Sequence, residues 1–449
     1  MRHPISKYFT LLLLSATFFS GQIFAAQSAS QEIESDLTLI QALQESQMQS
    51  LQIQKAKSAL EETEWKHSES LSTYLPTVSA SVNYLTDKKY MLLDTNIGGN
   101  ALTIPQVLPT TIYSLRATLP VFDGFASTNR YRSTRSLTEA AKNDYEWTQF
   151  NVSRQTVLQF YKSMASYVLQ NVAEQNLKTL EDHLKDVHAF KKAGVSTNYD
   201  VLRVEVQVSE AQTELLNSQD NVELAKYKLG EVLGKDSELR NLKGQLPVLT
   251  EASVAKLDQQ ILNHRKDILS LQQKSESANH MADAMNRYWI PRLNIFGETQ
   301  YYNNQTSGFD DSDHFRNAYT VGLNMTWNIF DGLQSTSRSG QSEQQAIQVE
   351  KALKISQLKA RQDFEFWKRK FKYFTTAAKS RLNDIQRSEE AVRLAKEGRK
   401  AGVTTSTQLL DAESDLFRSR AGLVNAQIGS IEALINLELA SGQTLYNFN

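Results

Sequence analysis

Apolar residues recur at intervals of three and four along a very long stretch, from Ala126 to Ala193, that contains neither proline nor glycine. This spacing is typical of a helical seam that packs against neighbouring helices. The seam consists of Leu158, Tyr161, Ala165, Val168 and Val172, followed by Leu177, Leu180, Leu184 and Val187. Its one step of five, between Val172 and Leu177, changes the local winding of a coiled coil without ending it. At the rise of an α-helix this stretch would be roughly 100 Å long.

A second proline-free segment, from about Tyr199 to Leu233, follows the first. The residues between them are Lys192-Ala193-Gly194-Val195-Ser196-Thr197. Glycine adopts the left-handed geometry that ends many helices, so this tip should reverse the chain. The sequence therefore predicts a very long helical hairpin.

The pattern upstream of the hairpin changes from helical to alternating. Thr38 and Gln41 fit a capping box, which predicts a helix from there to about Ser72. From Thr77 apolar and polar residues alternate, which predicts strands with one apolar face. The apolar positions are Val78, Ala80, Val82 and Tyr84 in the first strand and Tyr113, Leu115, Ala117, Leu119 and Val121 in the second. Turn residues between the strands, including Asp87-Lys88-Lys89, Gly98-Gly99-Asn100, Pro105 and Pro109, predict a loop.

The same order of elements recurs in the second half. A helix is expected from about Val254 to Arg287, and two strands are expected around a loop from Asn303 to Asn317. Their apolar positions are Leu293, Ile295, Gly297, Thr299 and Tyr301, then Tyr319, Val321, Leu323, Met325, Trp327 and Ile329. Phe296 is the one large apolar residue on the polar side of the first of these strands.

Three pairs of markers show that the chain is a tandem repeat. Phe122-Asp123-Gly124 recurs as Phe330-Asp331-Gly332, at an offset of 330 − 122 = 208. Lys192-Ala193-Gly194-Val195 recurs as Lys400-Ala401-Gly402-Val403, and Gly234 recurs as Gly442, at the same offset. Each copy contains a helix, two strands and a long hairpin. The expected division is a signal peptide 1–25, a first repeat 26–234, a connector 235–252, a second repeat 253–442 and a tail 443–449.

Charge and composition narrow the class of protein. The 449 residues carry a formal net charge of -1, so bulk electrostatics does not favour nucleic acid. Arg2 and Lys7 precede an apolar run from Tyr8 to Phe19, and small residues surround Ala25, which is the pattern of a cleaved export signal rather than a membrane anchor. The chain has no cysteine, which excludes a disulfide and a lipid-modified N-terminal cysteine.

The four predicted strands have the length and alternation of membrane-spanning strands. Four strands cannot close a barrel, and open sheet edges do not occur in lipid, so several chains must contribute. Three chains would give twelve strands, and aromatic residues near the strand ends would suit interfacial girdles. These residues are Tyr84, Tyr113, Tyr301, Tyr319 and Trp327. A soluble sandwich would not explain helices of this length, and a trimeric surface adhesin, the main alternative, should have consecutive terminal strands.

The chain has paired Phe-Asp-Gly strand ends, paired Ala-Gly-Val tips, and Leu75-Pro76 and Ile290-Pro291 before the strands. In these motifs the sequence resembles the outer-membrane efflux (TolC) family, and the resemblance extends over essentially the whole mature chain. The resemblance implies a mixed α+β membrane protein: a homotrimer with a twelve-stranded outer-membrane barrel continuous with a long α-helical coiled-coil barrel through the periplasm. It also implies a periplasmic adaptor protein and an inner-membrane transporter of the RND or ABC type as partners. The channel would export small molecules or proteins, and residues 235–252 with the C-terminal tail would form an equatorial region around the tunnel.

The resemblance also suggests site residues. In that family the hairpin tips dock onto the adaptor; the matching residues are Ala193, Gly194, Val195, Ser196, Thr197, Ala401, Gly402, Val403, Thr404 and Thr405. Rings of aspartate narrow the tunnel of family members at its periplasmic end. Asp411 matches one ring, whereas Gln408 stands where a second aspartate is expected. Three copies of Asp411 would favour cations. The alternative is a solvated carboxylate on the outer face.

No catalytic constellation is present in the sequence. It has no phosphate-binding Gly-x-x-x-x-Gly-Lys-Ser/Thr loop, no His-Glu-x-x-His and no Gly-x-Ser-x-Gly. His183 and His188 are five residues apart, which does not place them on one helical face as metal ligands. The aromatic and basic run from Phe364 to Tyr373 fits packing with a solvated basic face better than nucleic-acid binding. We therefore expect no enzyme activity, no cofactor and no metal, and energy for transport must come from a partner.

Overall fold

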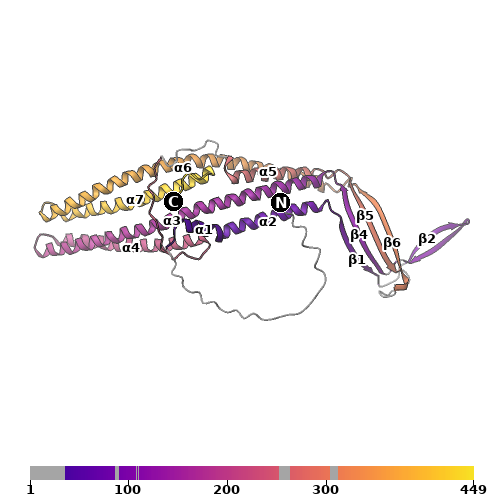
Figure 1. The fold of residues 1–449 in the computed structure, drawn as a ribbon, viewed down its shortest axis with the longest axis horizontal. Helices are drawn as coiled ribbons and strands as arrows, with labels where there is room; N and C mark the ends of the chain where they lie inside the picture. The colour runs from indigo at the N-terminus through magenta and orange to yellow at the C-terminus, as the bar shows by residue number, and fades with distance from the viewer. Residues whose placement is uncertain are drawn as a thin grey trace.

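The molecule is elongated, with its main sheet near one end and the tips of two helical hairpins at the other (Figure 1). The computed structural model describes residues 36–85, 90–107, 109, 111–251, 263–303 and 312–448. The predicted signal segment 1–25 lies outside this part of the chain. The helices are α1 Leu39–Gln49, α2 Leu51–Ser72, α3 Ala126–Lys192, α4 Asn198–Leu233, α5 Lys266–Met285, α6 Gln334–Lys400 and α7 Ser406–Ser441. The strands are β1 Thr77–Tyr84, β2 Tyr90–Ile97, β3 Asn100–Val107, β4 Thr111–Phe122, β5 Arg292–Asn303 and β6 Phe315–Thr326, and a short 3-10 helix covers Ser312–His314.

The long helices confirm the predicted hairpins and their duplication. Helices α3 and α6 have 67 residues each, and α4 and α7 have 36 residues each. Helix α3 packs against α4, α6 packs against α7, and α7 also lies along α3. None of the described helices combines the length and apolarity that a membrane span requires.

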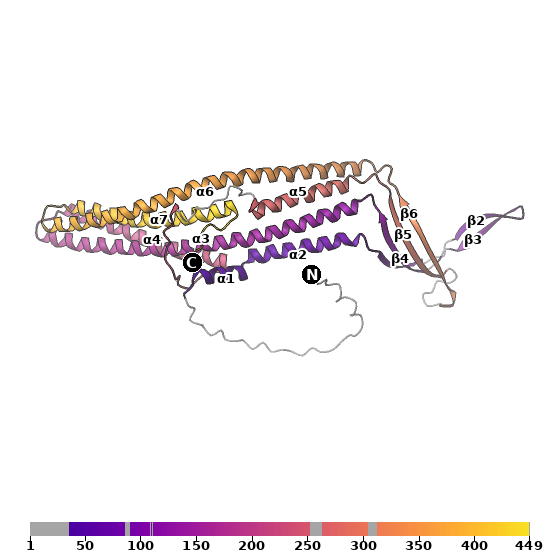
Figure 2. The ribbon, with the colours of Figure 1, turned by 45° about the horizontal axis from the view of Figure 1, so that its top comes forward.

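Shorter helices extend the bundle towards the sheet, where the partners α4 and α7 do not reach (Figure 2). Helix α2 packs on α3, and α5 packs on both α3 and α6. The predicted capping box is present, because the Thr38 hydroxyl accepts the Gln41 N–H at 3.3 Å and the Gln41 amide oxygen accepts the Thr38 N–H at 3.0 Å. The single helix expected up to Ser72 is wrong, since Ser50 has ψ of 122° and divides it into α1 and α2. The expected start of α5 near Val254 lies outside the described residues.

The main sheet is antiparallel, in the order β1-β4-β5-β6. Its register places the apolar residues of neighbouring strands opposite one another: Val82 faces Tyr113, Leu119 faces Ile295, and Ile295 faces Leu323. One face of the sheet is therefore apolar across all four strands. The last strand ends at Thr326, earlier than predicted, because its partner β5 begins at Arg292 and leaves Trp327 and Ile329 without a neighbour in the ladder.

The segment between β1 and β4, predicted as a loop, contains a second sheet. Strands β2 and β3 pair from Tyr90 opposite Val107 to Ile97 opposite Asn100. Gly98 and Gly99 both have positive φ, 63° and 87°, which is the geometry of a tight hairpin turn. The Asp94 carboxylate accepts the Thr103 hydroxyl at 2.6 Å across the ladder. The prediction was wrong because the Gly-Gly pair was interpreted as loop composition instead of a hairpin signal; Asp87-Lys88-Lys89 lie outside the described residues.

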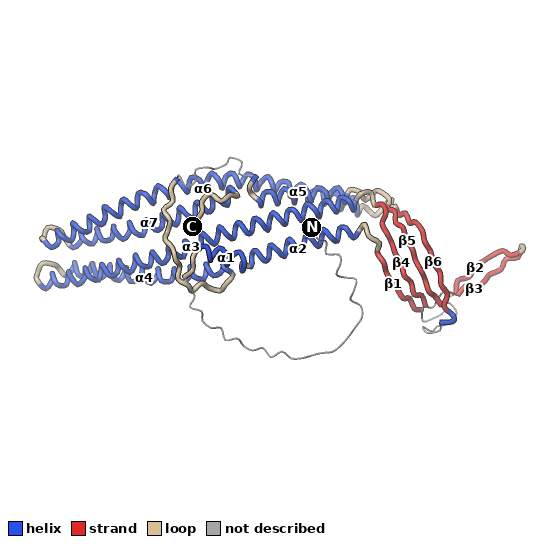
Figure 3. The backbone as a smooth tube through the Cα atoms, in the orientation of Figure 1, coloured by secondary structure: helices blue, strands red, loops and turns tan. Residues whose placement is uncertain are grey.

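The largest core lies midway along the helices, where the connector and the C-terminal tail cross them (Figure 3). It joins Phe160 of α3, Leu229 of α4 and Leu434 of α7 to Leu249 of the connector and Phe448 of the tail. Leu37 pairs with Leu242 as an isolated parallel bridge. Close packing here requires glycine, since a Cβ at Gly230 would come within 2.5 Å of the Ser237 backbone.

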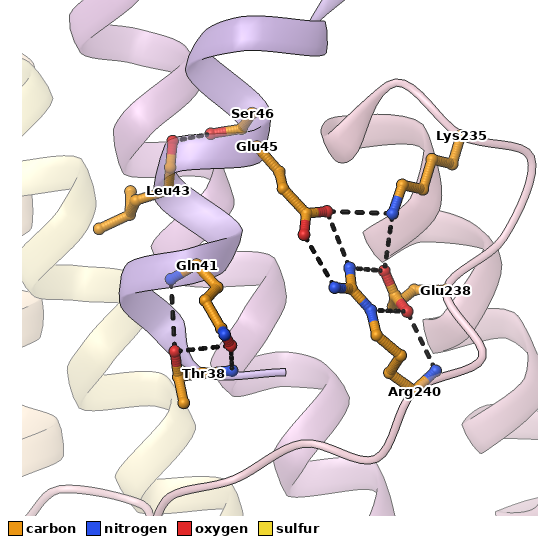
Figure 4. A network of polar contacts seen from close by, with 8 residues as sticks. All are labelled: Thr38, Gln41, Leu43, Glu45, Ser46, Lys235, Glu238 and Arg240. Atoms are coloured by element: carbon orange, nitrogen blue, oxygen red, sulfur yellow. Dashed lines mark hydrogen bonds and ion pairs between the residues drawn. The ribbon is translucent and has the colours of Figure 1, made fainter. Parts of the chain in front are cut away.

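A charged network fixes the connector to α1 (Figure 4). The Arg240 guanidinium donates to both oxygens of Glu45 at 2.8 Å and also to Glu238. Lys235 donates to the second Glu45 oxygen at 3.0 Å. The hydrogen bond from Arg240, more than any other contact, lowers the pKa of Glu45 to about 2.

This network predicts a loss of stability in acid. A carboxyl whose pKa is lowered by folding contributes stability that is complete above its unfolded pKa and disappears as the pH falls through the folded pKa. Thermal unfolding of the wild type should therefore shift to lower temperature between about pH 4.5 and about pH 2. Glu45→Gln, which cannot ionise, should be less stable at pH 7 and should lose less on acidification. Equal slopes for the two proteins would contradict the prediction.

Candidate functional site at the hairpin tips

The tip of the first hairpin is a closed, well-defined turn. Gly194 follows α3 with φ of 75°, and the N–H groups of Gly194 and Val195 donate to the carbonyls of Lys191 and Phe190 at 3.0 and 2.9 Å. These two bonds form a Schellman motif, which pairs carbonyls that a helix end leaves free. Helix α4 then starts with a capping box, in which the Thr197 hydroxyl accepts the N–H of Asp200 at 3.1 Å. The Thr197 N–H and hydroxyl in turn donate to the Asp200 carboxylate and lower its pKa.

The second tip repeats this geometry. Gly402 has φ of 72°, and the N–H groups of Gly402 and Val403 donate to the carbonyls of Arg399 and Gly398. Helix α7 starts with a capping box between Thr405 and Gln408. A Cβ at Gly398 would lie 2.2 Å from the Thr404 hydroxyl oxygen, so a larger residue there would require the Thr404 side chain to shift. The predicted tip residues therefore form two matching turns at the same end of the molecule (Figure 1).

Each tip presents an exposed valine. The side chain of Val195 is 66% exposed and that of Val403 is 79% exposed. The surrounding residues are held by the turn itself, so each apolar side chain is displayed on a rigid backbone. A rigid apolar knob loses little conformational entropy when a partner covers it.

Contacts between the hairpins join the tips into one unit. Arg399, at the end of α6, donates to the Ser196 hydroxyl of the first tip at 2.7 Å. Its guanidinium also lies 4.9 Å from the centre of the Phe190 ring. Sequence reasoning did not identify Arg399, because nothing local to it indicates a partner two hundred residues away.

The two gate candidates have different environments. The Gln408 side chain is used in the capping box, where its oxygen accepts the Thr405 N–H at 2.9 Å. The residue at the same position of the first repeat is Asp200, which caps α4 in the same way. Gln408 is therefore a helix-capping residue, which explains why an amide can replace a carboxylate there. The Asp411 carboxylate is exposed and lies 3.8 Å from the guanidinium of Arg203.

Arg203 and Asp411 occupy equivalent positions in the two repeats, at the offset of 208. Arg203 also donates to the Thr407 hydroxyl at 3.1 Å, so it joins α4 to α7 near the tips. The prediction that Asp411 favours cations took account of carboxylates only. In the structure the Arg203 guanidinium of the same chain lies beside the Asp411 carboxylate, and the spacing of residues within one repeat could not have indicated this.

A buried polar cluster also links the hairpins where α7 begins, directly after the second tip. His183 of α3 hydrogen-bonds to the Glu413 carboxylate at 2.9 Å through Nδ1 and to the Ser406 hydroxyl at 3.0 Å through Nε2. Lys396 of α6 approaches the second Glu413 oxygen at 3.6 Å. This cluster was not found from sequence, because its members come from three helices that are distant in the chain.

Each of the two tandem units contains strands that feed a long helical hairpin. The sequence profile of the outer membrane efflux protein family matches residues 41–235 and 257–443, and the chain belongs to this family. The outer membrane efflux protein BepC of Brucella suis biovar 1 (strain 1330) is 21% identical over 446 residues, which cover 99% of this chain and 92% of BepC.

Solved structures confirm the fold. The outer membrane channel CmeC of Campylobacter jejuni has a TM-score of 0.74 and 15% identity, covering 97% of this chain and 94% of that chain. The outer membrane channel MtrE of Neisseria gonorrhoeae, in its open state, has a TM-score of 0.72 and 18% identity, covering 92% and 90%. Family membership makes the protein an efflux channel of the outer membrane that extends into the periplasm, not an enzyme, and sets aside the surface-adhesin alternative.

Proposed function

We propose that three copies of the chain form a twelve-stranded barrel continuous with an α-helical tunnel. The observation that carries the proposal is the four-stranded sheet, which is mainly apolar on one face and, within the described residues, ends in two unpaired edges, β1 and β6. Unpaired edges cannot face lipid, and the β6 edge of one protomer can be closed by the β1 edge of the next. Tyr84, Tyr301 and Tyr319 at one end and Trp327 at the other are exposed and suit the two interfaces of a membrane.

Exposed apolar stripes on the helices support the same assembly. On α4 the stripe contains Leu202, Val206, Leu224 and Tyr227; on α6 it contains Ile355, Leu358, Phe366 and Tyr373. Both follow helical spacing and lie on faces that no other described part of the chain covers. Neighbouring protomers in a trimer would cover them and close the tunnel wall.

The assembled duct is passive. It receives cargo through the hairpin tips, which dock onto a periplasmic adaptor protein, and an inner-membrane transporter supplies the energy. The transporter is of the RND type if the cargo is a small molecule, or of the ABC type, as in type I secretion, if the cargo is a protein. An N-terminal signal peptide directs the chain out of the cytoplasm.

The entrance of the duct is lined by alternating charges. Three copies of Arg203 and three of Asp411 lie at equivalent positions around the pseudo-sixfold axis of the tunnel. Because each Asp411 carboxylate has an Arg203 guanidinium beside it, the net charge of this cross-section of the tunnel is close to zero instead of strongly negative. Gln408 carries no charge, and its side chain caps the start of α7.

Conductance of the purified protein in planar bilayers tests the proposal. Native mass should correspond to a trimer, and a channel should appear; a monomer without conductance would exclude the duct. Arg203→Gln should raise the preference for cations by about fivefold, and Asp411→Asn should lower it by a similar factor, since an exposed charge acts by only about 1 kcal/mol. Unchanged selectivity in both variants would place these charges on the outer surface of the tunnel.

A further inference from the structure

The two junctions between strand and long helix share a strained backbone. Phe125 and Leu333 have φ of 65° and 66°, and both follow a glycine with positive φ, Gly124 or Gly332. Among the described residues these are the non-glycine residues with positive φ. The two positions are related by the repeat offset of 208. A large apolar residue is rarely found in the left-handed region, and such outliers mark positions where the side chain has a role.

The turn itself does not require these side chains. The Asp123 carboxylate accepts the Ser127 N–H at 2.7 Å, and the Asp331 carboxylate accepts the Ser335 N–H at 3.0 Å, so the aspartates start α3 and α6. A Cβ at Gly124 would lie 2.8 Å from Ile290, so glycine is required there by packing. Glycine at the next position would relieve the strain. The local fold therefore does not account for a phenylalanine at 125 or a leucine at 333.

The register shows which way Phe125 lies. A bulge between Pro120 and Phe122 shifts the pairing, so that Phe122 is opposite Leu293, a residue of the apolar face. The rings of Phe122 and Phe125 meet edge to face with centroids 5.6 Å apart. Phe125 therefore extends the apolar face of the sheet beyond its last paired residue, towards the helices.

These side chains are exposed together. Phe125 is 63% exposed and Leu333 is 62% exposed, and Phe330 beside Leu333 is also exposed. Exposed arginines follow on the second turns of both helices: Arg132 on α3 and Arg338 on α6. An apolar and aromatic group followed within about 10 Å by a cation matches the change from acyl chains to phosphate at a membrane surface.

We propose that Phe125 and Leu333, with Phe122 and Phe330, insert into the phospholipid leaflet on the periplasmic side of the outer membrane. The inference rests on the proposed membrane barrel and goes beyond it, because Phe125, Phe330 and Leu333 lie outside the strands and Phe122 is the last residue of β4. The partner is a phospholipid surface, since the group continues the apolar face of the sheet. The two anchors would fix the depth of the barrel at the point where the tunnel begins.

Spin labels test this in the assembled protein. The chain has no cysteine, so single variants Phe125→Cys and Leu333→Cys can be labelled uniquely. Cysteine keeps a Cβ at the strained positions. Val321→Cys on the apolar face of β6 and Val403→Cys at the tip are the matched controls. Collision with oxygen, which is enriched in lipid, and with a water-soluble nickel chelate is measured by power saturation in phosphatidylethanolamine–phosphatidylglycerol vesicles.

Labels at 125 and 333 should behave like the label at 321, with high oxygen and low nickel accessibility, and unlike the label at 403. Labels at 125 and 333 that collide with the nickel chelate would lie in water and would overturn the inference. If the label at 321 were still exposed to lipid in that case, the proposed membrane barrel would stand. Labels shielded from both reagents would mean that a neighbouring protomer covers them, which also overturns it. A label at 321 without oxygen accessibility would instead refute the membrane barrel.

Discussion

Replacing both tip valines with aspartate, V195D and V403D together, should abolish export while the channel still folds and inserts. Both side chains are exposed, and both turns are held by backbone hydrogen bonds that do not involve the valine side chains. The substitution therefore adds no strain to the free protein. In the docked state it would bury six unpaired carboxylates per trimer, and even one buried unpaired charge costs about 3 kcal/mol or more, which corresponds to at least about a 100-fold loss of affinity.

Export by intact cells is the measurement, with the amount of trimer in the outer membrane determined alongside it. Val248→Asp is the matched control, because this valine is also exposed but lies on the connector, midway along the helices. A photo-crosslinking probe at Val403 identifies the partner directly. Capture of the adaptor of a proton-driven pump would indicate small-molecule efflux, and capture of the adaptor of an ATP-driven exporter would indicate secretion. Normal export by the double variant would exclude docking through the valines.

The long elements could be predicted because their patterns are regular and continuous. The predicted first helix of the hairpin, Ala126 to Ala193, differs from α3 by one residue, and the strand at Thr77–Tyr84 was predicted with its bounds. Alternation and three-four spacing result from burial on one face, and here a single face is buried over each whole element. The break at Ser50 and the hairpin at Gly98-Gly99 were missed because each depends on one or two residues, too few to change a periodic pattern.

The candidate site could be predicted only as far as it is local. The tips follow from Gly194 and Gly402, since a left-handed glycine and the following threonine determine the turn within a few residues. Arg203 beside Asp411, and His183 beside Glu413, depend on how two hairpins pack side by side. Such contacts are fixed by the supercoil of the whole bundle. The tandem repeat was the one long-range signal available, and comparing equivalent positions would have paired Arg203 with Asp411.

Replacing Glu438 of α7 with alanine should strongly destabilise the core where the connector and the tail cross the helices. Glu438 is fully buried in α7 and accepts three hydrogen bonds: from Arg154 of α3 at 2.8 Å, and from the backbone N–H groups of Leu445 and Tyr446 at 2.6 and 2.9 Å. Its loss would leave the largely buried Arg154 guanidinium without its carboxylate and would release the tail. Breaking a buried ion pair in this way costs about 3–5 kcal/mol.

Thermal unfolding followed by helical circular dichroism measures the effect, and limited chymotrypsin digestion at Tyr446 reports release of the tail. Glu432→Ala is the matched control, because Glu432 lies on the same helix and pairs with Lys162 of α3 at 3.1 Å, but both side chains are about 40% exposed. An exposed pair contributes at most about 1 kcal/mol. The control should therefore unfold close to the wild type, with its tail protected. Equal shifts of the unfolding temperature for the two variants would contradict the prediction. They would mean that neither the burial of the Glu438 carboxylate nor its hydrogen bonds to the tail determine the stability of this core.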